Sequence, residues 1–154
     1  MRTDVRLGDV AELAHLNVVR VRAPLGDPLM ADFTNNIERI NQLAEQSDGF
    51  VWRLEADGDS TYGMAAGAPD VILTLSVWES LAALRSFVFK SEHAAFLRRR
   101  REWFLPYGGP YLALWWVPNG TRPSLEEAMR RLAHLTEHGP SDEAFTFASA
   151  YEPT

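Results

Sequence analysis

Four short stretches of the chain alternate hydrophobic residues, mostly β-branched or aromatic, with polar ones. A period of two is typical of strands that bury one face. The first stretch is AHLNVVRVRA, and the turn-forming run PLGDP follows it closely. The others are GFVWRLEA, VILTLSVW and YLALWWV. The pattern therefore predicts four strands, over residues 14–23, 49–56, 71–78 and 111–117.

Hydrophobic residues at helical spacing occupy much of the chain between and after these strands. The helix predicted over 28–46 rests on Leu29, Phe33, Ile37, Ile40 and Leu43. A second helical region is predicted over 79–104, with a break near Lys90 and Ser91. A last helix is predicted over 124–138, because the Ser and Glu of SLEE have the spacing of a capping box. The run AFTFASAY after it is a short strand or an ordered tail.

The order of these elements is β-α-β-β-α-β followed by one more helix. This is the ferredoxin-like pattern of an α+β fold. We expect residues 11–147 to form this single domain, with residues 1–10 and 148–154 as terminal tails. The loop DGDSTYGMAAGAPD, residues 57–70, is long enough to serve as a lid over a cavity mouth.

The second face of the predicted sheet leads to a prediction about assembly. The two crossover helices cover only one face, and the hydrophobic stripe of the last helix looks too narrow to cover the other. We expect that open face to carry Trp115, Tyr111, Val19, Val21 and Trp78. Covering such a patch on two partners would stabilise a dimer by roughly 10 kcal/mol before association costs. The prediction is a two-fold symmetric homodimer with its sheets facing.

The strands also differ between their two faces. The first, third and fourth strands each have one mainly aliphatic register and one mixed register. The mixed registers contribute His15, Asn17, Thr74, Ser76, Trp78, Tyr111 and Trp115. If these residues share a face, they line an aromatic cavity with a few polar groups, as small-ligand sites do. The alternative is an amphipathic sheet with one partly hydrated face and ordinary dimer contacts.

The segment FKSEHAAFLRRRREWF mixes aromatic residues, a histidine and four arginines in one predicted helix. At 100° per residue one stripe holds Phe89, His93, Leu97, Arg100 and Phe104, with Phe96 at its edge. The other three arginines spread over the remaining sides. An arginine on an apolar stripe must find an acceptor or extend its charge outward. His93 is therefore either a core histidine beside an arginine stem, or a proton carrier or ligand with Arg100 as an anion-binding group.

Composition excludes several classes of function. The formal net charge of −6 argues against a general nucleic-acid binder, and no apolar run approaches the roughly 18 residues of a membrane span. The chain has no cysteine, and its start, MRTDVRLGDV, lacks an apolar signal core, so we expect a cytoplasmic protein. His134 and His138 have the spacing of metal ligands but no third ligand nearby, so no metal site is predicted.

Four stretches together resemble a known family. They are LAHLNVVRVRAPLGDP, GFVWRL, SVWESLAALRSFVFKSEHAAFLRRRREWF and LWWVPNGTRP. They resemble the bacterial family called domain of unknown function 3291, over about residues 11–147. That family is grouped with the dimeric α/β-barrel proteins, whose best known members are the antibiotic-biosynthesis monooxygenases. The resemblance implies a ferredoxin-like protomer and a dimeric α/β barrel, and it assigns no activity.

A second resemblance concerns haem. The string VWES…VFKSEH is similar to the segment of the haem-degrading monooxygenases of that superfamily that ends in their haem-ligand histidine. His93 matches the ligand, and Asn17 matches an asparagine on their first strand. Ala83 stands ten residues before His93, where those enzymes have a tryptophan that distorts haem. The alternative interpretation is that these residues form a packing pattern of the superfamily.

The leading hypothesis is an enzyme that needs no cofactor. It would be a monooxygenase-like or related tailoring enzyme that acts on a small apolar, aromatic or polyketide-like compound. His93 or His15 would act as the base, and Asn17 and Arg100 would stabilise a developing oxyanion. The residues expected to bind the substrate are His15, Trp78, Ser76, Trp115, Tyr111, Phe89 and Phe96. The alternatives are a haem-binding protein with His93 as axial ligand and a non-catalytic binder of a small ligand.

Overall fold

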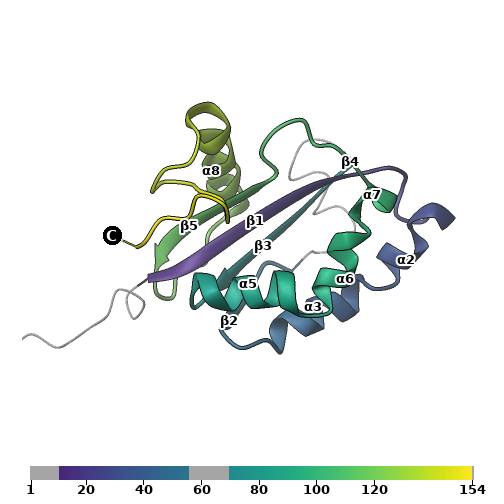
Figure 1. Cartoon of the computed structure of the whole chain (residues 1–154), viewed down its shortest axis with the longest axis horizontal. Coiled ribbons are helices and arrows are strands. Elements are labelled where there is room, and N and C mark those ends of the chain that lie inside the picture. Colours follow the sequence, from purple (N-terminus) through teal and green to yellow (C-terminus); the bar gives the residue numbers. More distant parts are fainter. Residues whose placement is uncertain (1–10, 56–69, 154) are drawn as a thin grey trace, which may run out of the picture.

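A computed structural model describes residues 11–55 and 70–153, and its centre is one antiparallel sheet (Figure 1). The strands are β1 (Ala11–Val21), β2 (Phe50–Arg53), β3 (Val71–Trp78), β4 (Phe104–Leu105) and β5 (Leu112–Pro118). β1 lies in the middle, with β3 and then β2 on one side and β5 on the other. The two-residue β4 pairs with the end of β1. This arrangement confirms the α+β class and the ferredoxin-like strand order.

The helices before the last one are shorter than the sequence pattern predicts, whereas the last helix has the predicted bounds. The helices are η1 (Pro28–Met30), α2 (Ala31–Thr34), α3 (Ile37–Glu45), α5 (Leu81–Lys90), α6 (His93–Arg98), α7 (Arg100–Trp103) and α8 (Leu125–His138). The predicted break after Lys90 is confirmed, because Ser91 has an extended backbone there. The Ser91 hydroxyl donates to the Phe87 carbonyl and accepts from the His93 N–H. Ser91 therefore ends α5 and places His93 at the start of α6.

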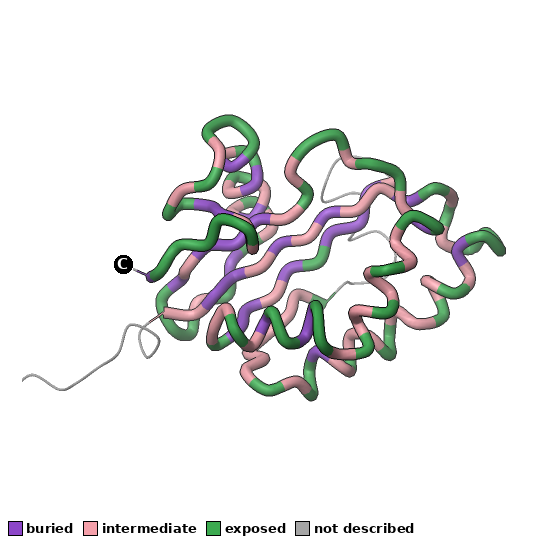
Figure 2. Tube along the Cα trace, viewed as in Figure 1, coloured by how far each residue is buried: buried purple, intermediate pink, exposed green. Residues whose placement is uncertain are grey.

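The two faces of the sheet are covered by different helices. α3 and α5 pack on one face, against Leu13, Trp78 and Leu114. α8 lies on the other side of the sheet, where its Ala128, Leu132 and Leu135 pack against a continuous aliphatic layer (Figure 1). That layer consists of Ala14, Leu16, Val18, Val71, Leu73, Leu75, Val77, Ala113 and Val117. Buried and partly buried residues alternate in the middle of β1, from Ala14 to Val19, as a result (Figure 2).

The prediction of an uncovered second face is therefore wrong. Trp115 is 0% exposed and packs under α8, while Trp78 is 1% exposed and packs under α3 and α5. The stripe of α8 is extended by Leu135 and by Ala144 of the following segment, so the chain covers this face itself. AFTFASAY is not a strand, although Phe145 makes an isolated bridge to Leu114. The homodimer stays a prediction, but an exposed sheet face no longer supports it.

Three further expectations meet the structure differently. Within residues 11–55 and 70–153, no helix is long and apolar enough to cross a membrane. The predicted lid over residues 57–70 lies outside the described residues except for Asp70, whose carboxylate pairs with Arg20 at 2.8 Å. The helix capping box is confirmed in part, because the Ser124 hydroxyl accepts from the Glu127 N–H.

Candidate functional site

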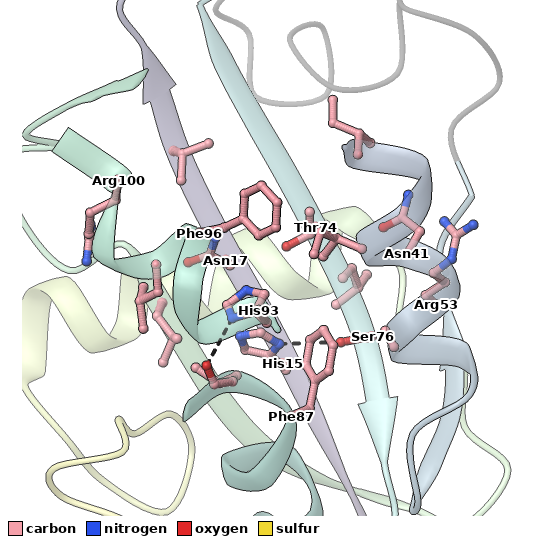
Figure 3. Close-up of a pocket in the computed structure, with 18 of the residues that line it drawn as sticks. His15, Asn17, Asn41, Arg53, Thr74, Ser76, Phe87, His93, Phe96 and Arg100 are labelled. Carbon is pink, nitrogen blue, oxygen red and sulfur yellow. Dashed lines mark hydrogen bonds between the residues drawn. The ribbon is translucent and has the colours of Figure 1, made fainter. Parts of the chain in front are cut away.

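A cavity of about 400 Å³ lies between the sheet and the helices α3, α5, α6 and α7. Its walls are mostly aromatic and aliphatic side chains, and a few polar groups stand among them (Figure 3). This is the composition that small-molecule sites have. The cavity exists because the helices span the sheet without filling the space above the middle of β1 and β3.

The floor of the cavity carries four polar side chains from two neighbouring strands. His15 and Asn17 come from β1, and they stand opposite Ser76 and Thr74 of β3, respectively. Residues two apart on a strand point to the same face, so all four reach the cavity. Thr74 is exposed although it lies in the middle of β3, because its side chain meets open space. The mixed registers of these two strands therefore share one face, as predicted.

His15 belongs to a short hydrogen-bonded chain. The Trp78 indole Nε1 donates to the Ser76 hydroxyl at 3.0 Å, and Ser76 Oγ lies 3.4 Å from His15 Nδ1. Burial disfavours the charged imidazole, and the neighbouring His93 adds to the effect. Together they lower the pKa of His15 to about 3. His15 is therefore neutral at pH 7, and it is a weak base.

His93 lies beside His15 and is oriented by the backbone of α5 (Figure 3). Its Nδ1 lies 3.1 Å from the Val88 carbonyl oxygen. A carbonyl only accepts, so Nδ1 carries the proton and Nε2 keeps a free lone pair. Burial lowers the pKa of His93, and the bond to Val88 partly opposes that shift. The ring also lies 4.9 Å from the Phe87 ring, between centroids. His93 is thus a neutral imidazole with one available basic nitrogen.

Asn17 and Arg100 complete the polar part of the wall. Within the described residues the Asn17 amide makes no hydrogen bond, so its donors and its acceptor are available to a ligand. Arg100 Nη1 donates to the Tyr111 hydroxyl at 2.8 Å, and its guanidinium lies 4.5 Å from the centre of the Tyr111 ring. The Tyr111 carbonyl accepts from the Val18 N–H, which fixes Tyr111 beside β1.

Most of the predicted site residues are brought together here. The cavity is lined by His15, Asn17, Ser76, Trp78, Phe89, His93, Phe96, Arg100 and Tyr111. The predicted stripe of Phe89, His93, Leu97, Arg100 and Phe104 faces the cavity even though the helix is broken. Their catalytic or binding roles stay predictions.

The placement of Trp115 in the cavity is wrong. Its partner on β1 is Ala14, so it shares the face that α8 covers. Its indole Nε1 is buried there without a hydrogen-bond partner among the described residues. The neighbouring register of β5, which holds Leu112, Leu114 and Trp116, faces α5 and the chain end instead.

Three polar residues of the cavity wall were missed: Asn36, Asn41 and Arg53. Arg53 reaches the wall because β2 has an irregular register between Phe50 and Trp52, which puts Phe50 and Arg53 on the same face. Nothing in a two-residue period signals such a bulge. Asn41 lies on α3 at the cavity, one turn from Ile37. Its position on the apolar stripe of that helix was the available signal.

The haem-like motif has a packing explanation at Ala83. Gly49, which has a φ of +84°, approaches α5 so closely that an added Cβ would lie 2.4 Å from the Ala83 Cβ. Ala83 thus abuts the start of β2, and a larger side chain at this position meets backbone. No group of three or more potential metal ligands occurs within residues 11–55 and 70–153. The rings of His134 and His138 lie 4.6 Å apart between centres and are tilted by 46°, and His134 faces Glu143.

Comparisons with known proteins give a family and some distant structural relatives. The family model for the domain of unknown function DUF3291 matches residues 12–154. No curated protein matches the chain. The cofactor-independent oxygenase SnoaB of Streptomyces nogalater is 16% identical, with a TM-score of 0.42 over 74% of this chain and 96% of its own.

Two further solved structures are similar at the same level. A monooxygenase from the gene ActVA-Orf6 of Streptomyces coelicolor, in complex with nanaomycin D, is 16% identical, with a TM-score of 0.42 over 78% of this chain and 100% of its own. A putative antibiotic biosynthesis monooxygenase of Chloroflexus aurantiacus is 12% identical, with a TM-score of 0.44 over 74% and 98%. Likeness of this degree carries no argument about activity.

Proposed function

Because the chain belongs to the family of the domain of unknown function DUF3291, which assigns no activity, we propose its function from the cavity. We propose that the protein binds a small, mostly apolar molecule there and acts on it as a cofactor-independent, monooxygenase-like enzyme. The proposal rests on one observation. The oriented neutral imidazole of His93 and the amide of Asn17, which makes no hydrogen bond among the described residues, line the same apolar cavity.

The two histidines take different parts in the proposed reaction. His93 Nε2 removes a proton from a hydroxyl or an acidic C–H of the substrate, because its Nδ1 is already bonded to Val88. His15 is too weak a base for that step and serves as a hydrogen-bonding partner. The Asn17 amide donates to the oxygen on which negative charge develops.

The electrons come from the substrate itself. Molecular oxygen accepts them from the substrate anion, and a CH₂ group beside an aromatic ring becomes a carbonyl. One oxygen atom enters the product, and the other leaves as water with the two hydrogens of the CH₂ group. The protein supplies the base, the hydrogen-bond donor and aromatic walls that hold the substrate. These are the groups that the cavity offers.

Oxygen consumption tests this proposal with a panel of hydroxylated polycyclic aromatic compounds. On a turned-over substrate, His93→Gln is expected to lower kcat by roughly 100-fold, and Asn17→Ala by a similar factor. His138→Gln, on the exposed end of α8, is the matched control and should keep full activity. Full turnover in both cavity variants would show that this site is wrong.

A non-catalytic role is the outcome to distinguish in the same experiment. A binder holds its ligand without converting it, and it needs no proton carrier. Tight binding with no oxygen consumption, and no loss of affinity in His93→Gln, would replace the enzyme by a binding protein. In either case the cavity would be the site at which the ligand binds.

Haem binding is a second candidate, favoured by one specific observation. The bond from His93 Nδ1 to the Val88 carbonyl leaves Nε2 free, as in histidines that ligate metals. When bound, haem would supply redox chemistry at its iron, and His93 would hold it from α6. Haemin titration is expected to give a Soret band that His93→Ala shifts and His138→Ala does not. An unchanged band in His93→Ala would remove this candidate.

A further inference from the structure

The charge of the cavity wall differs from that of the whole protein. The chain has 21 acidic residues and a formal charge of −6. None of the described residues that line the cavity is an aspartate or a glutamate, whereas two arginines, Arg53 and Arg100, reach it. Both cavity histidines are neutral at pH 7, so the wall carries positive charge only. A wall of this kind selects against cations and leaves room for a negative group on the ligand.

The two arginines are not equivalent. Arg53 is already neutralised, because its Nε lies 2.7 Å from a carboxylate oxygen of Glu45. Arg100 contacts Tyr111 and has no carboxylate partner among the described residues. Arg39 and Arg99, on the same side of the molecule, each pair with a carboxylate. Arg100 is therefore the cationic group of the cavity whose charge is left unbalanced.

The Arg100–Tyr111 contact also fixes the available donors. Tyr111 Oη accepts from Arg100 Nη1, so its own O–H proton remains free to donate. The remaining N–H groups of the guanidinium form a planar fork that matches a carboxylate or a similar oxyanion. Arg100 and Asn17 both line the cavity, and Figure 3 shows them on the same side of the histidine pair.

We infer that the natural ligand is an apolar, aromatic molecule that carries one acidic group, which Arg100 and Tyr111 bind. The acidic group lies at the α7 end of the cavity, and the apolar frame extends over Thr74 and Asn17 toward the histidine pair. This inference rests on the proposed binding function and adds the chemical class of the ligand. It assigns Arg100 to ligand binding rather than to stabilising a developing oxyanion.

Two dyes with the same aromatic frame test the inference. 8-Anilino-1-naphthalenesulfonate carries an anionic group, and N-phenyl-1-naphthylamine is its neutral counterpart. Both become fluorescent in apolar surroundings. Tyr111 is 37% exposed, so water partly screens the charge of Arg100, and an ion pair at such a site favours the anion by about 5-fold in affinity. The wild-type protein is therefore expected to bind the sulfonate about 5-fold more tightly than the neutral dye.

Variants of Arg100 and Tyr111 test whether these two residues cause the preference for the anionic dye. In Arg100→Gln the affinity for the sulfonate should fall until it equals the affinity for the neutral dye, and Arg100→Lys should restore part of the difference. Tyr111→Phe keeps the ring and removes one donor, so it should reduce the preference without abolishing it. Arg98→Gln, on the exposed side of α6, is the control and should keep the full preference.

The outcomes separate this inference from the function on which it rests. If Arg100→Gln keeps the full preference, or if the wild type shows none, the acidic group is wrong and the cavity stays a binding site. Thr74→Trp fills the cavity from its floor, because Thr74 points into open space. If that variant binds both dyes as the wild type does, they bind elsewhere, and both the proposed function and this inference fall.

Discussion

The two faces of the sheet are built from the same strands and have opposite properties. The face under α8 is a closed layer in which Leu16 and Val18 are at most 1% exposed. The face under α3, α5 and α6 carries Asn17 and Val19 from the same strand, and it encloses a cavity. One set of alternate residues of β1 therefore packs in the core, and the other set lines the cavity.

The difference shows how one strand supports both stability and function. The closed layer is apolar except for the Trp115 indole N–H, which has no partner among the described residues, whereas the wall of a cavity can hold His15, Asn17 and Thr74 side by side. The closed face fixes the position of β1, and that rigidity fixes the polar groups on its other side. The comparison predicts that adjacent residues of β1 respond differently to the same kind of substitution.

The largest difference is expected between Leu16→Ala and Asn17→Ala. Leu16 is fully buried, so its truncation should lower the free energy of unfolding by about 2–5 kcal/mol. Asn17 makes no hydrogen bond among the described residues, and its truncation should change that free energy by less than about 0.5 kcal/mol. Urea denaturation of both variants measures the difference. Equal losses of unfolding free energy would mean that the face of the sheet that lines the cavity is packed as tightly as the face under α8.

The free energy of unfolding should also depend on pH, because of His15 on the face that lines the cavity. The pKa of His15 is about 3 in the folded chain and 6.5 in its ordinary state, so the unfolded chain binds a proton first as the pH falls. The free energy of unfolding should therefore decrease between pH 6.5 and 3, by up to about 1.4 kcal/mol per pH unit. Above pH 6.5 this contribution is fully present.

The variant His15→Gln isolates that contribution. Its unfolding free energy should fall less steeply with decreasing pH than that of the wild type, while His138→Gln should follow the wild-type slope. Denaturant titrations at pH 7, 6, 5 and 4 provide the comparison. Parallel curves for His15→Gln and the wild type would contradict the assignment of His15 as a buried neutral imidazole.

A smaller effect separates Val18→Thr from Val19→Thr. The substitution adds one hydroxyl at nearly constant volume. On the closed face at Val18 the hydroxyl lacks a partner, which should lower the free energy of unfolding by about 1–2 kcal/mol. On the cavity wall at Val19 it remains accessible, and the change should stay below about 0.5 kcal/mol. Similar thermal midpoints for the two variants would remove the distinction.

Much of this site could be predicted from the pattern of the sequence. In β1 and β3 one register is aliphatic and the other holds polar residues, so the cavity floor of His15, Asn17 and Ser76 follows from alternation alone. The stripe that includes His93 and Arg100 follows from helical spacing, and it survives the break at Ser91 because both pieces keep facing the sheet.

The errors have equally local causes. Both registers of YLALWWV are hydrophobic and each contains a tryptophan, so the pattern does not say which of Trp115 and Trp116 faces the helices. The pairing of Ala14 with Trp115 decides it. The closure of the second face was missed because α8 covers it together with Ala144 from beyond the helix. The spacing of hydrophobic residues within one segment does not indicate that two segments will cover a face together.

The most direct test of the account is a crystal structure of the protein soaked with N-phenyl-1-naphthylamine. Electron density for the dye is expected between the floor formed by β1 and β3 and the helices α3, α5 and α6, in contact with Thr74 and His93. A cavity filled by protein side chains, or a dye bound only elsewhere, would contradict the central claim that this face of the sheet is a small-molecule site.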